Sequence, residues 1–364
     1  MSKDRNNFAV NGLLGVMFAA TAIGAPLAAV AAEESSGSSD SVQMKKAESL
    51  YGRGKVKEAI AEFRETIRIE PTNAKAHQRL GAALAANEDY DTAILEEKQA
   101  IKLDPKYFLP HVVLGQIYAN QSKIDLALEE FRQATTLKPT SFRAHLDLGF
   151  ALTHVGQVDE AIAAYKKAAE INPKDPTPHL NLGVLLAQKN EFQEAIKEEK
   201  EAIAINKDVP ESYINLGNIY ADSGDIENAI AAFKSALKLV PKHPNALSGL
   251  GWMMQKKGDL TGAIETQRKA IKSDPKFGPA HRRLAEALFQ SGDTKGARTA
   301  FEETLVITPR DVTARVQYAQ FLTKQGQTAD AIKEYTKALE INPKSKIAQD
   351  ALSELNKKTP TKQQ

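Results

Sequence analysis

Small and apolar residues recur along this chain at a fixed interval of 34 residues. One position of the interval holds alanine in nine successive copies: Ala59, Ala93, Ala127, Ala161, Ala195, Ala229, Ala263, Ala297 and Ala331. The residue twelve positions earlier is small in most copies, and the residue four positions later is often aromatic. An interval of this length is typical of stacked structural repeats rather than of one globular domain.

Proline places the boundaries of the repeats. Eight prolines share one position, and Lys207 fills the remaining slot: Pro71, Pro105, Pro139, Pro173, Pro241, Pro275, Pro309 and Pro343. With this proline numbered as position 32, the nine repeats span residues 40–345 and begin at Asp40, Ala74, Phe108, Phe142, Pro176, Pro210, Pro244, Gly278 and Val312. Proline ends a helix, and the glycine that six repeats carry at position 15 can take the left-handed conformation that ends another. Each repeat is therefore predicted to be a helix–turn–helix.

Residues at the same repeat position form a column when the nine repeats are aligned. These columns resemble those of the tetratricopeptide repeat family, with small residues at positions 8 and 20, aromatic residues at 24 and proline at 32. The resemblance implies an all-α, right-handed superhelical solenoid over residues 40–345. Residues 346–355 follow an amphipathic pattern, with Ile347, Ala348, Ala351 and Leu355 on one side, and are predicted to form a C-terminal capping helix. We expect residues 356–364 to form a disordered tail.

The N-terminus has a different pattern. Lys3 and Arg5 precede an uncharged stretch, Phe8 to Ala32, that ends in small residues. This order is typical of a secretory signal peptide over residues 1–32, cleaved after Ala31 or Ala32. The alternative is an uncleaved anchor formed by residues 8–32. Cleavage predicts a periplasmic or secreted protein, and a retained anchor predicts a membrane-anchored one. Both interpretations place the repeats outside the cytoplasm, after a flexible linker at residues 33–39.

Composition and charge exclude several classes of function. The net charge of +2 gives no broad basic surface for nucleic acid, and the chain has no cysteine for disulfides or thiolate metal sites. The repeats leave no space for a separate catalytic domain, so we predict neither an enzyme nor a cofactor. The five histidines at position 4 are expected to pack between helices rather than to bind metal: His77, His111, His145, His179 and His281. Three repeats carry Glu97, Glu199 or Gln267 at position 24, and we expect those helices to turn a polar edge to solvent or to a partner.

In the family, the first helix of each repeat supplies an inner, concave surface through positions 2, 5, 6, 9, 12 and 13. Carried over to the central repeats, these positions predict a groove for an extended peptide, lined by Val112, Leu146, Asp147, Phe150, Leu180, Asn181, Ile214, Asn215, Asn218 and Trp252. The two amides at position 6 could bond a peptide backbone, because each offers a donor and an acceptor. The alternative is that residues at positions 5 and 6 pack against the neighbouring repeat.

The family's carboxylate clamp combines lysine at position 5 with asparagine at positions 6 and 9. Ile214 precedes Asn215 here, and no repeat has lysine at position 5, so we exclude that mode. The resemblance instead implies an extracytoplasmic scaffold whose partners are proteins bound on the concave surface. A membrane is involved only if the N-terminal segment is retained. The alternative function is a structural or self-assembling tether in an envelope secretion or polysaccharide-export complex.

Overall fold

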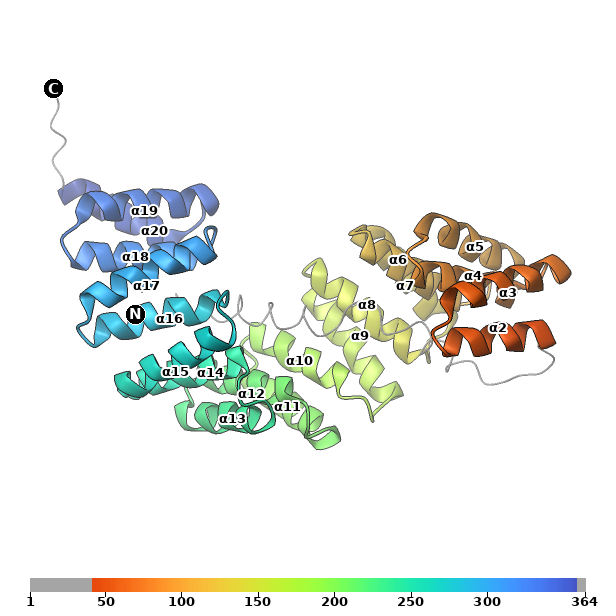
Figure 1. Cartoon of the computed structure of the whole chain (residues 1–364), viewed down its shortest axis with the longest axis horizontal. Coiled ribbons are helices and arrows are strands. Elements are labelled where there is room, and N and C mark those ends of the chain that lie inside the picture. Colours follow the sequence, from red (N-terminus) through yellow and green to blue (C-terminus); the bar gives the residue numbers. More distant parts are fainter. Residues whose placement is uncertain (1–40, 359–364) are drawn as a thin grey trace, which may run out of the picture. The chain divides into compact units, whose positions relative to one another are not determined.

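The structure is a computed structural model that describes residues 41–358, all of them in α-helices or short connections (Figure 1). The predicted signal segment, its alternative as an anchor and the predicted linker lie outside the described residues. The described chain forms two compact units, residues 41–205 and residues 206–358. The predicted all-α architecture of paired helices is confirmed in both units.

The first unit contains ten helices among the described residues: α2 (Val42–Gly52), α3 (Val56–Ile69), α4 (Ala74–Ala86), α5 (Tyr90–Leu103), α6 (Leu109–Asn120), α7 (Ile124–Leu137), α8 (Phe142–His154), α9 (Val158–Ile171), α10 (Thr177–Gln188) and α11 (Phe192–Ile205). Each even-numbered helix is the first helix of a repeat, and the following odd-numbered helix is the second. The turn between them begins near position 13 and ends near position 16, as the sequence pattern predicts.

The second unit contains nine helices among the described residues: α12 (Pro210–Ser223), α13 (Ile226–Leu239), α14 (Pro244–Lys256), α15 (Leu260–Ser273), α16 (Gly278–Gln290), α17 (Thr294–Ile307), α18 (Val312–Lys324), α19 (Thr328–Ile341) and α20 (Lys346–Lys358). The last helix packs against α19. It is longer than predicted, because residues 356–358, which we assigned to the tail, continue it. Lysine is a good helix former, and the first helix-breaking residue in the sequence is Pro360.

The connection inside each repeat uses a left-handed residue at position 15. The six predicted glycines all have positive φ, between 74° and 91°. Three repeats lack glycine there, and Glu88, Ser122 and Asn190 take the same conformation, with φ of 60–64°. Several second helices then begin at an aspartate whose side chain accepts a backbone N–H in the first turn, as Asp259 does from Gly262 at 2.8 Å.

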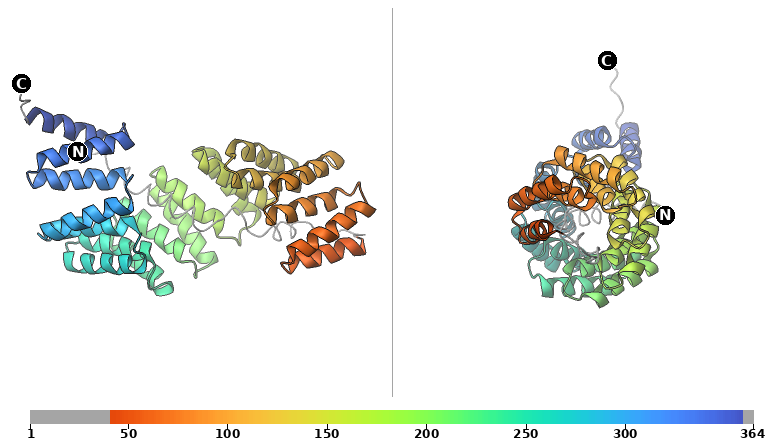
Figure 2. Two further views of the ribbon diagram at one scale, coloured as in Figure 1. Left: turned by 45° about the horizontal axis from the view of Figure 1, so that its top comes forward. Right: turned by 90° about the vertical axis from the view of Figure 1, so that its right-hand side faces the viewer.

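Within each unit the helix pairs stack in sequence order (Figure 2). The second helix of one repeat packs against the first helix of the next. First helices of neighbouring repeats also pack against each other, as α4 does with α6 and α12 with α14, whereas among the described helices no successive second helices do so to the same extent. First helices therefore lie on the inner side of the curvature of each unit.

The core of each repeat lies between its two helices. The alanine at position 20 is almost completely buried in all nine repeats. Glycine at position 8 allows the aromatic ring at position 24 to lie against the first helix. A Cβ atom built on Gly115 would lie 2.5 Å from Cε1 of Phe131, which is closer than real Cβ atoms approach a neighbour. The small and large columns of the sequence therefore follow from one close helix–helix contact.

Candidate functional site

The predicted groove residues of the first unit lie on α6, α8 and α10. Val112 is fully buried and packs with Ala144 of the next first helix. Leu146 is also buried, whereas Leu180 and Phe150 are half-buried. Side chains at position 5 therefore differ: Val112 packs against the neighbouring repeat, whereas Leu180 is partly exposed on the inner face.

Asp147 joins two first helices of this unit. Its Oδ2 atom accepts hydrogen bonds from Gln116 Nε2 on α6, at 2.7 Å, and from Arg143 Nε on α8, at 2.8 Å. Asn181 is buried, and its Nδ2 atom donates to the backbone oxygen of Thr177, one helical turn earlier, at 2.9 Å. The polar residues at position 6 of this unit are thus already engaged in bonds on the inner face.

The remaining predicted residues belong to the second unit, on α12 and α14. Ile214 and Asn215 are buried, while Asn218 and Trp252 are half-buried. Ile214 and Trp252 belong to one apolar cluster with Phe233. The structure gives Asn215 Oδ1 no hydrogen-bond donor among the described residues. The two asparagines therefore differ: Asn181 donates a hydrogen bond to the Thr177 carbonyl, whereas the amide oxygen of Asn215 accepts none from the described residues.

Sequence reasoning missed a charged cluster around Trp252. The guanidinium of Arg283, on α16, lies over the indole ring at 4.8 Å from its centroid, and Lys256 Nζ, on α14, lies at 5.8 Å. Arg283 Nη1 also donates to Ser248 Oγ at 2.9 Å. Ser248, Lys256 and Arg283 occupy positions 5, 13 and 6. Ser248 and Lys256 belong to the repeat that holds Trp252, and Arg283 belongs to the next. These inner-surface positions can be read from the sequence, but the contact of Arg283 with the ring cannot.

Burial shifts the pKa values of three charged residues in and around this cluster. Burial raises the pKa of Asp222 to about 6, against a smaller opposite effect of Arg283. Burial also raises the pKa of Glu286 and lowers the pKa of Arg283 to about 9, so that the guanidinium stays charged at neutral pH. All three shifts arise because low-dielectric surroundings disfavour the charged form.

The prediction for the polar residues at position 24 is wrong. Glu97, Glu199 and Gln267 are fully buried rather than turned to solvent or to a partner. Glu97 lies against Gly81, where an added Cβ would stand 2.5 Å from Glu97 Oε1. Each of the three side chains therefore occupies the place that a ring fills in the other repeats, because the backbone directs position 24 inward whatever its chemistry.

The histidines at position 4 pack between the two helices of a repeat. In three repeats the Nδ1 atom lies 2.6–2.7 Å from a glutamate Oε2 at position 23: His77 with Glu96, His111 with Glu130, and His179 with Glu198. Arg315 makes the equivalent pair with Glu334 at 2.6 Å. These pairs connect the first helix of a repeat to its second helix. Between residues 41 and 358, no three His, Asp or Glu side chains gather in a way that could hold a metal ion.

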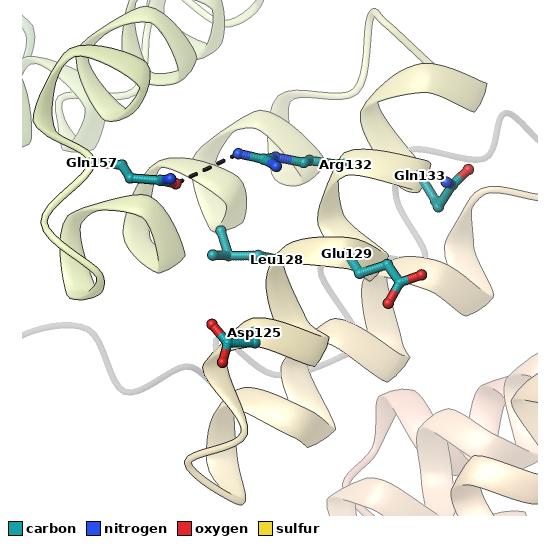
Figure 3. A pocket seen from close by; sticks show the side chains of 6 residues that line it. All are labelled: Asp125, Leu128, Glu129, Arg132, Gln133 and Gln157. Atoms are coloured by element: carbon teal, nitrogen blue, oxygen red, sulfur yellow. Dashed lines mark hydrogen bonds between the residues drawn. The ribbon is translucent and has the colours of Figure 1, made fainter.

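The outer side of the first unit has one open hollow, on α7 (Figure 3). It is lined by Asp125, Leu128, Glu129, Arg132, Gln133 and Gln157. Arg132 crosses to the next repeat, where it bonds Glu160 at 2.8 Å and Gln157 at 3.5 Å. None of the residues lining the hollow has a buried polar side-chain atom without a hydrogen-bond partner among the described residues. None of the helices in the described part of the chain is both long and apolar enough to cross a bilayer.

Family models match most of the repeat region. A model described as TPR repeat matches residues 115–156, 152–190 and 217–258, and two models described as tetratricopeptide repeat match residues 44–108, 254–311 and 288–355. Together these matches span more than half of the chain. A search of curated proteins finds no match.

Solved structures share the fold. A tetratricopeptide repeat protein from Parabacteroides merdae is 16% identical, with a TM-score of 0.61, over 68% of this chain and 98% of that one. The Cut9–Hcn1 hetero-tetramer of the APC/C is 22% identical, with a TM-score of 0.53, over 77% of this chain and 55% of that one. The aligned region thus spans about half the length of the latter. From its repeat columns, its helix pairs and these family models, the chain belongs to the tetratricopeptide repeat family and is a scaffold for protein–protein interaction.

Proposed function

We propose that this chain is an extracytoplasmic scaffold that binds an extended segment of a partner protein along the inner face of its first helices. The observation that carries the proposal is the pair of partly exposed polar and aromatic side chains on that face in the second unit. Asn218 and Trp252 are half-buried at inner-face positions, near the buried Asn215. The Asn218 amide would bond a peptide backbone, and Trp252 would supply apolar contact.

The residues on this face have different roles in the proposal. Leu180 and Phe150 are partly exposed in the first unit, and Asn218 and Trp252 are partly exposed in the second. Each pair would contact a peptide bound on the inner face of its own unit. Val112, Leu146 and Ile214 are buried and would support the face from behind. Asp147 and Asn181 are buried, and through their own bonds they would hold in place the helices that the peptide contacts.

A crosslinking pull-down from the native envelope fraction tests the proposal. The wild-type chain is compared with a Leu180→Asp, Asn181→Ala, Asn215→Ala variant of equal helicity. A protein captured by the wild type and lost by the variant would support binding on the inner face. Equal capture by both would move the site to the outer helices or the ends and would refute the proposed residues.

The proposed location rests on the order of basic, apolar and small residues before Glu33. Cell fractionation combined with the N-terminal mass of the purified chain tests it. A mature chain that begins at Ala32 or Glu33 in the soluble envelope fraction supports export and cleavage. An intact Met1 in membranes would indicate a retained anchor instead, and an intact chain in the cytosol would contradict the proposed location.

A further inference from the structure

Arg283 has more hydrogen-bond donors than the protein satisfies. Its side chain carries five N–H donors in a planar fork, and within residues 41–358 the structure gives only one of them an acceptor, Ser248 Oγ at 2.9 Å. No carboxylate of the described chain lies within ion-pairing distance of its guanidinium. The side chain is half-buried between α14 and α16, so water reaches only part of the fork. Unmet donors on a partly desolvated cation favour the binding of an anion.

Two acidic residues lie near Arg283, and neither forms an ion pair with it among the described residues. Glu286 pairs with Arg282, whose Nη1 atom lies 3.7 Å from Glu286 Oε1, and it acts on Arg283 and Lys256 only through longer-range attraction. Asp222 influences Arg283 only at longer range, and burial raises the pKa of its carboxyl to about 6. Lys256 lies beside the same indole ring and has no ion-pair partner in the described chain. Arg283 and Lys256 are therefore two cations next to one aromatic ring, without a counter-charge in contact.

We infer that Arg283, Lys256 and Trp252 form a receptor for a carboxylate carried by the bound peptide. This inference rests on the proposed function, since it names the chemistry of the segment bound on the inner face. The free edge of the guanidinium can hold both carboxylate oxygens in parallel hydrogen bonds, and Lys256 adds a second positive charge. The methylene groups of a glutamate side chain would lie against the indole ring.

This receptor differs from the carboxylate clamp that the sequence excludes. The clamp needs lysine at position 5 and asparagine at positions 6 and 9, whereas Arg283 is at position 6 and rests on Trp252 at position 9 of the preceding repeat. Position 5 of that preceding repeat is Ser248, which accepts one guanidinium bond and thereby orients the fork. A basic peptide would be repelled at this place, and a neutral one would leave the donors unmet.

Trp252 provides a direct readout, because it is the only tryptophan in the chain. The probes are two pools of random peptides with both ends blocked, one with glutamate and one with glutamine at the central position. The full-length chain is expected to retain the glutamate pool more strongly and to change its tryptophan emission on adding it. Arg283→Met should reduce retention of the glutamate pool roughly ten- to a hundredfold, as expected for charge-assisted hydrogen bonds. Retention by Arg283→Lys should lie between that of the wild type and that of Arg283→Met, since lysine keeps the positive charge but lacks the planar set of N–H donors.

Arg268→Met is the matched control. Arg268 lies exposed on α15 of the same unit, so this change removes the same charge away from Trp252 and should leave retention unchanged. Circular dichroism confirms that each variant has wild-type helicity. A third pool, with central glutamine and a free C-terminal carboxylate, separates the two sources of the anion. Its preferential retention would assign the receptor to a chain end, whereas retention of the blocked glutamate pool assigns it to an acidic side chain.

Three results would overturn the inference in distinguishable ways. Equal retention of all three pools by the wild type would show that peptides bind without a carboxylate preference, so the proposed function would stand and the receptor would not. Retention of none of the pools would refute both the receptor and the peptide-binding face. A glutamate preference that survives in Arg283→Met would place the anion site elsewhere in the chain.

Discussion

Glu97 is a carboxylate in a position where six other repeats place an aromatic ring. It is fully buried, and among residues 41–358 neither of its oxygens has a hydrogen-bond partner. Burial raises its pKa well above 4.5, and the nearby Glu96 adds to this against the opposing effect of Arg79. The side chain is therefore held as a neutral acid, since a buried, unpaired carboxylate is costly.

This burial predicts a pH-dependent stability. Above pH 4.5 the unfolded chain has released the proton of Glu97 while the folded chain still holds it, so the free energy of unfolding falls as pH rises. Glu97→Gln removes this contribution. Gln267 shows that the position accepts an amide, because its Nε2 atom donates to the Ser248 carbonyl at 2.9 Å. We expect the variant to be more stable than wild type at pH 8 by about 1–3 kcal/mol, measured by urea unfolding.

The matched control is Glu129→Gln, an exposed glutamate on α7. We expect the free energy of unfolding of this variant to equal that of the wild type at both pH 5 and pH 8. A Glu97→Gln variant whose stability keeps the wild-type dependence on pH would show that Glu97 does not hold a proton in the folded chain.

A second residue-scale prediction concerns the proposed carboxylate receptor. Asp222 competes with the ligand for Arg283, and its pKa of about 6 means that it becomes neutral as pH falls below that value. A peptide glutamate titrates near pH 4.3 and stays ionised. Retention of the glutamate pool should therefore rise roughly two- to tenfold between pH 7.5 and 5.5.

Asp222→Asn should weaken this rise, because the competing charge is absent at both pH values. Glu286 acts in the same direction through its raised pKa, whereas Arg283, with a pKa of about 9, keeps its charge over this range. Retention that falls on acidification would contradict the arrangement of charges argued for this cluster. The comparison uses the full-length chain, with peptide retention measured on the same immobilised protein.

Single residues show where prediction from sequence stops. Alanine at position 20 and the rings at position 24 were predictable, because a column of small or large side chains reflects one repeated contact. The burial of Glu97 was not predictable, because its residue type does not tell whether position 24 of that repeat faces the core or solvent. Its burial follows from the backbone, which keeps position 24 against position 8 in all six repeats that carry glycine there.

At the scale of the helix pair, the left-handed residue at position 15 governs the connection. Glu88 takes φ of 64° there, a conformation that costs a residue with a Cβ about 1–2 kcal/mol and glycine much less. Its side chain is exposed. We therefore expect Glu88→Gly to raise the free energy of unfolding by about 1 kcal/mol in urea titrations.

Asn87→Gly serves as the contrasting variant. Asn87 is the preceding residue and has φ of −93°, so glycine there gains no conformational relief and only adds freedom to the unfolded chain. It should be neutral or destabilising. Stabilisation by both substitutions, or by neither, would show that the left-handed backbone at position 15 is not the source of strain.

The helix pair was largely predictable from sequence. Prolines and glycines placed nearly every helix end, because they act through the local backbone rather than through distant contacts. The left-handed conformation of Glu88, Ser122 and Asn190 was not visible in residue type and follows from the shared geometry of the repeat. The His–Glu pairs across each repeat were also missed, although both columns, positions 4 and 23, can be read in the sequence.

At the scale of the whole molecule, the repeat order was predictable and the division into two units was not. The division falls at Ile205, close to Lys207, which interrupts the otherwise regular prolines. The candidate site is divided in the same way, with Asn181 in one unit and Asn215 in the other. The Trp252 cluster could not be derived from residue types alone, because it depends on how α14 and α16 place Arg283 over the ring.

Stability should be distributed along the units, because each repeat contacts mainly its neighbours. Phe131 is 1% exposed and fills the space above Gly115, so Phe131→Ala leaves a cavity that costs about 3–5 kcal/mol. We expect hydrogen exchange to increase in α6, α7 and α8 and to remain at wild-type levels in α16 to α20. Phe301→Ala, in the second unit, should give the converse pattern. Faster exchange along the entire chain in either variant would show that the repeats unfold as one cooperative body, and a local defect could then abolish binding at every inner-face position.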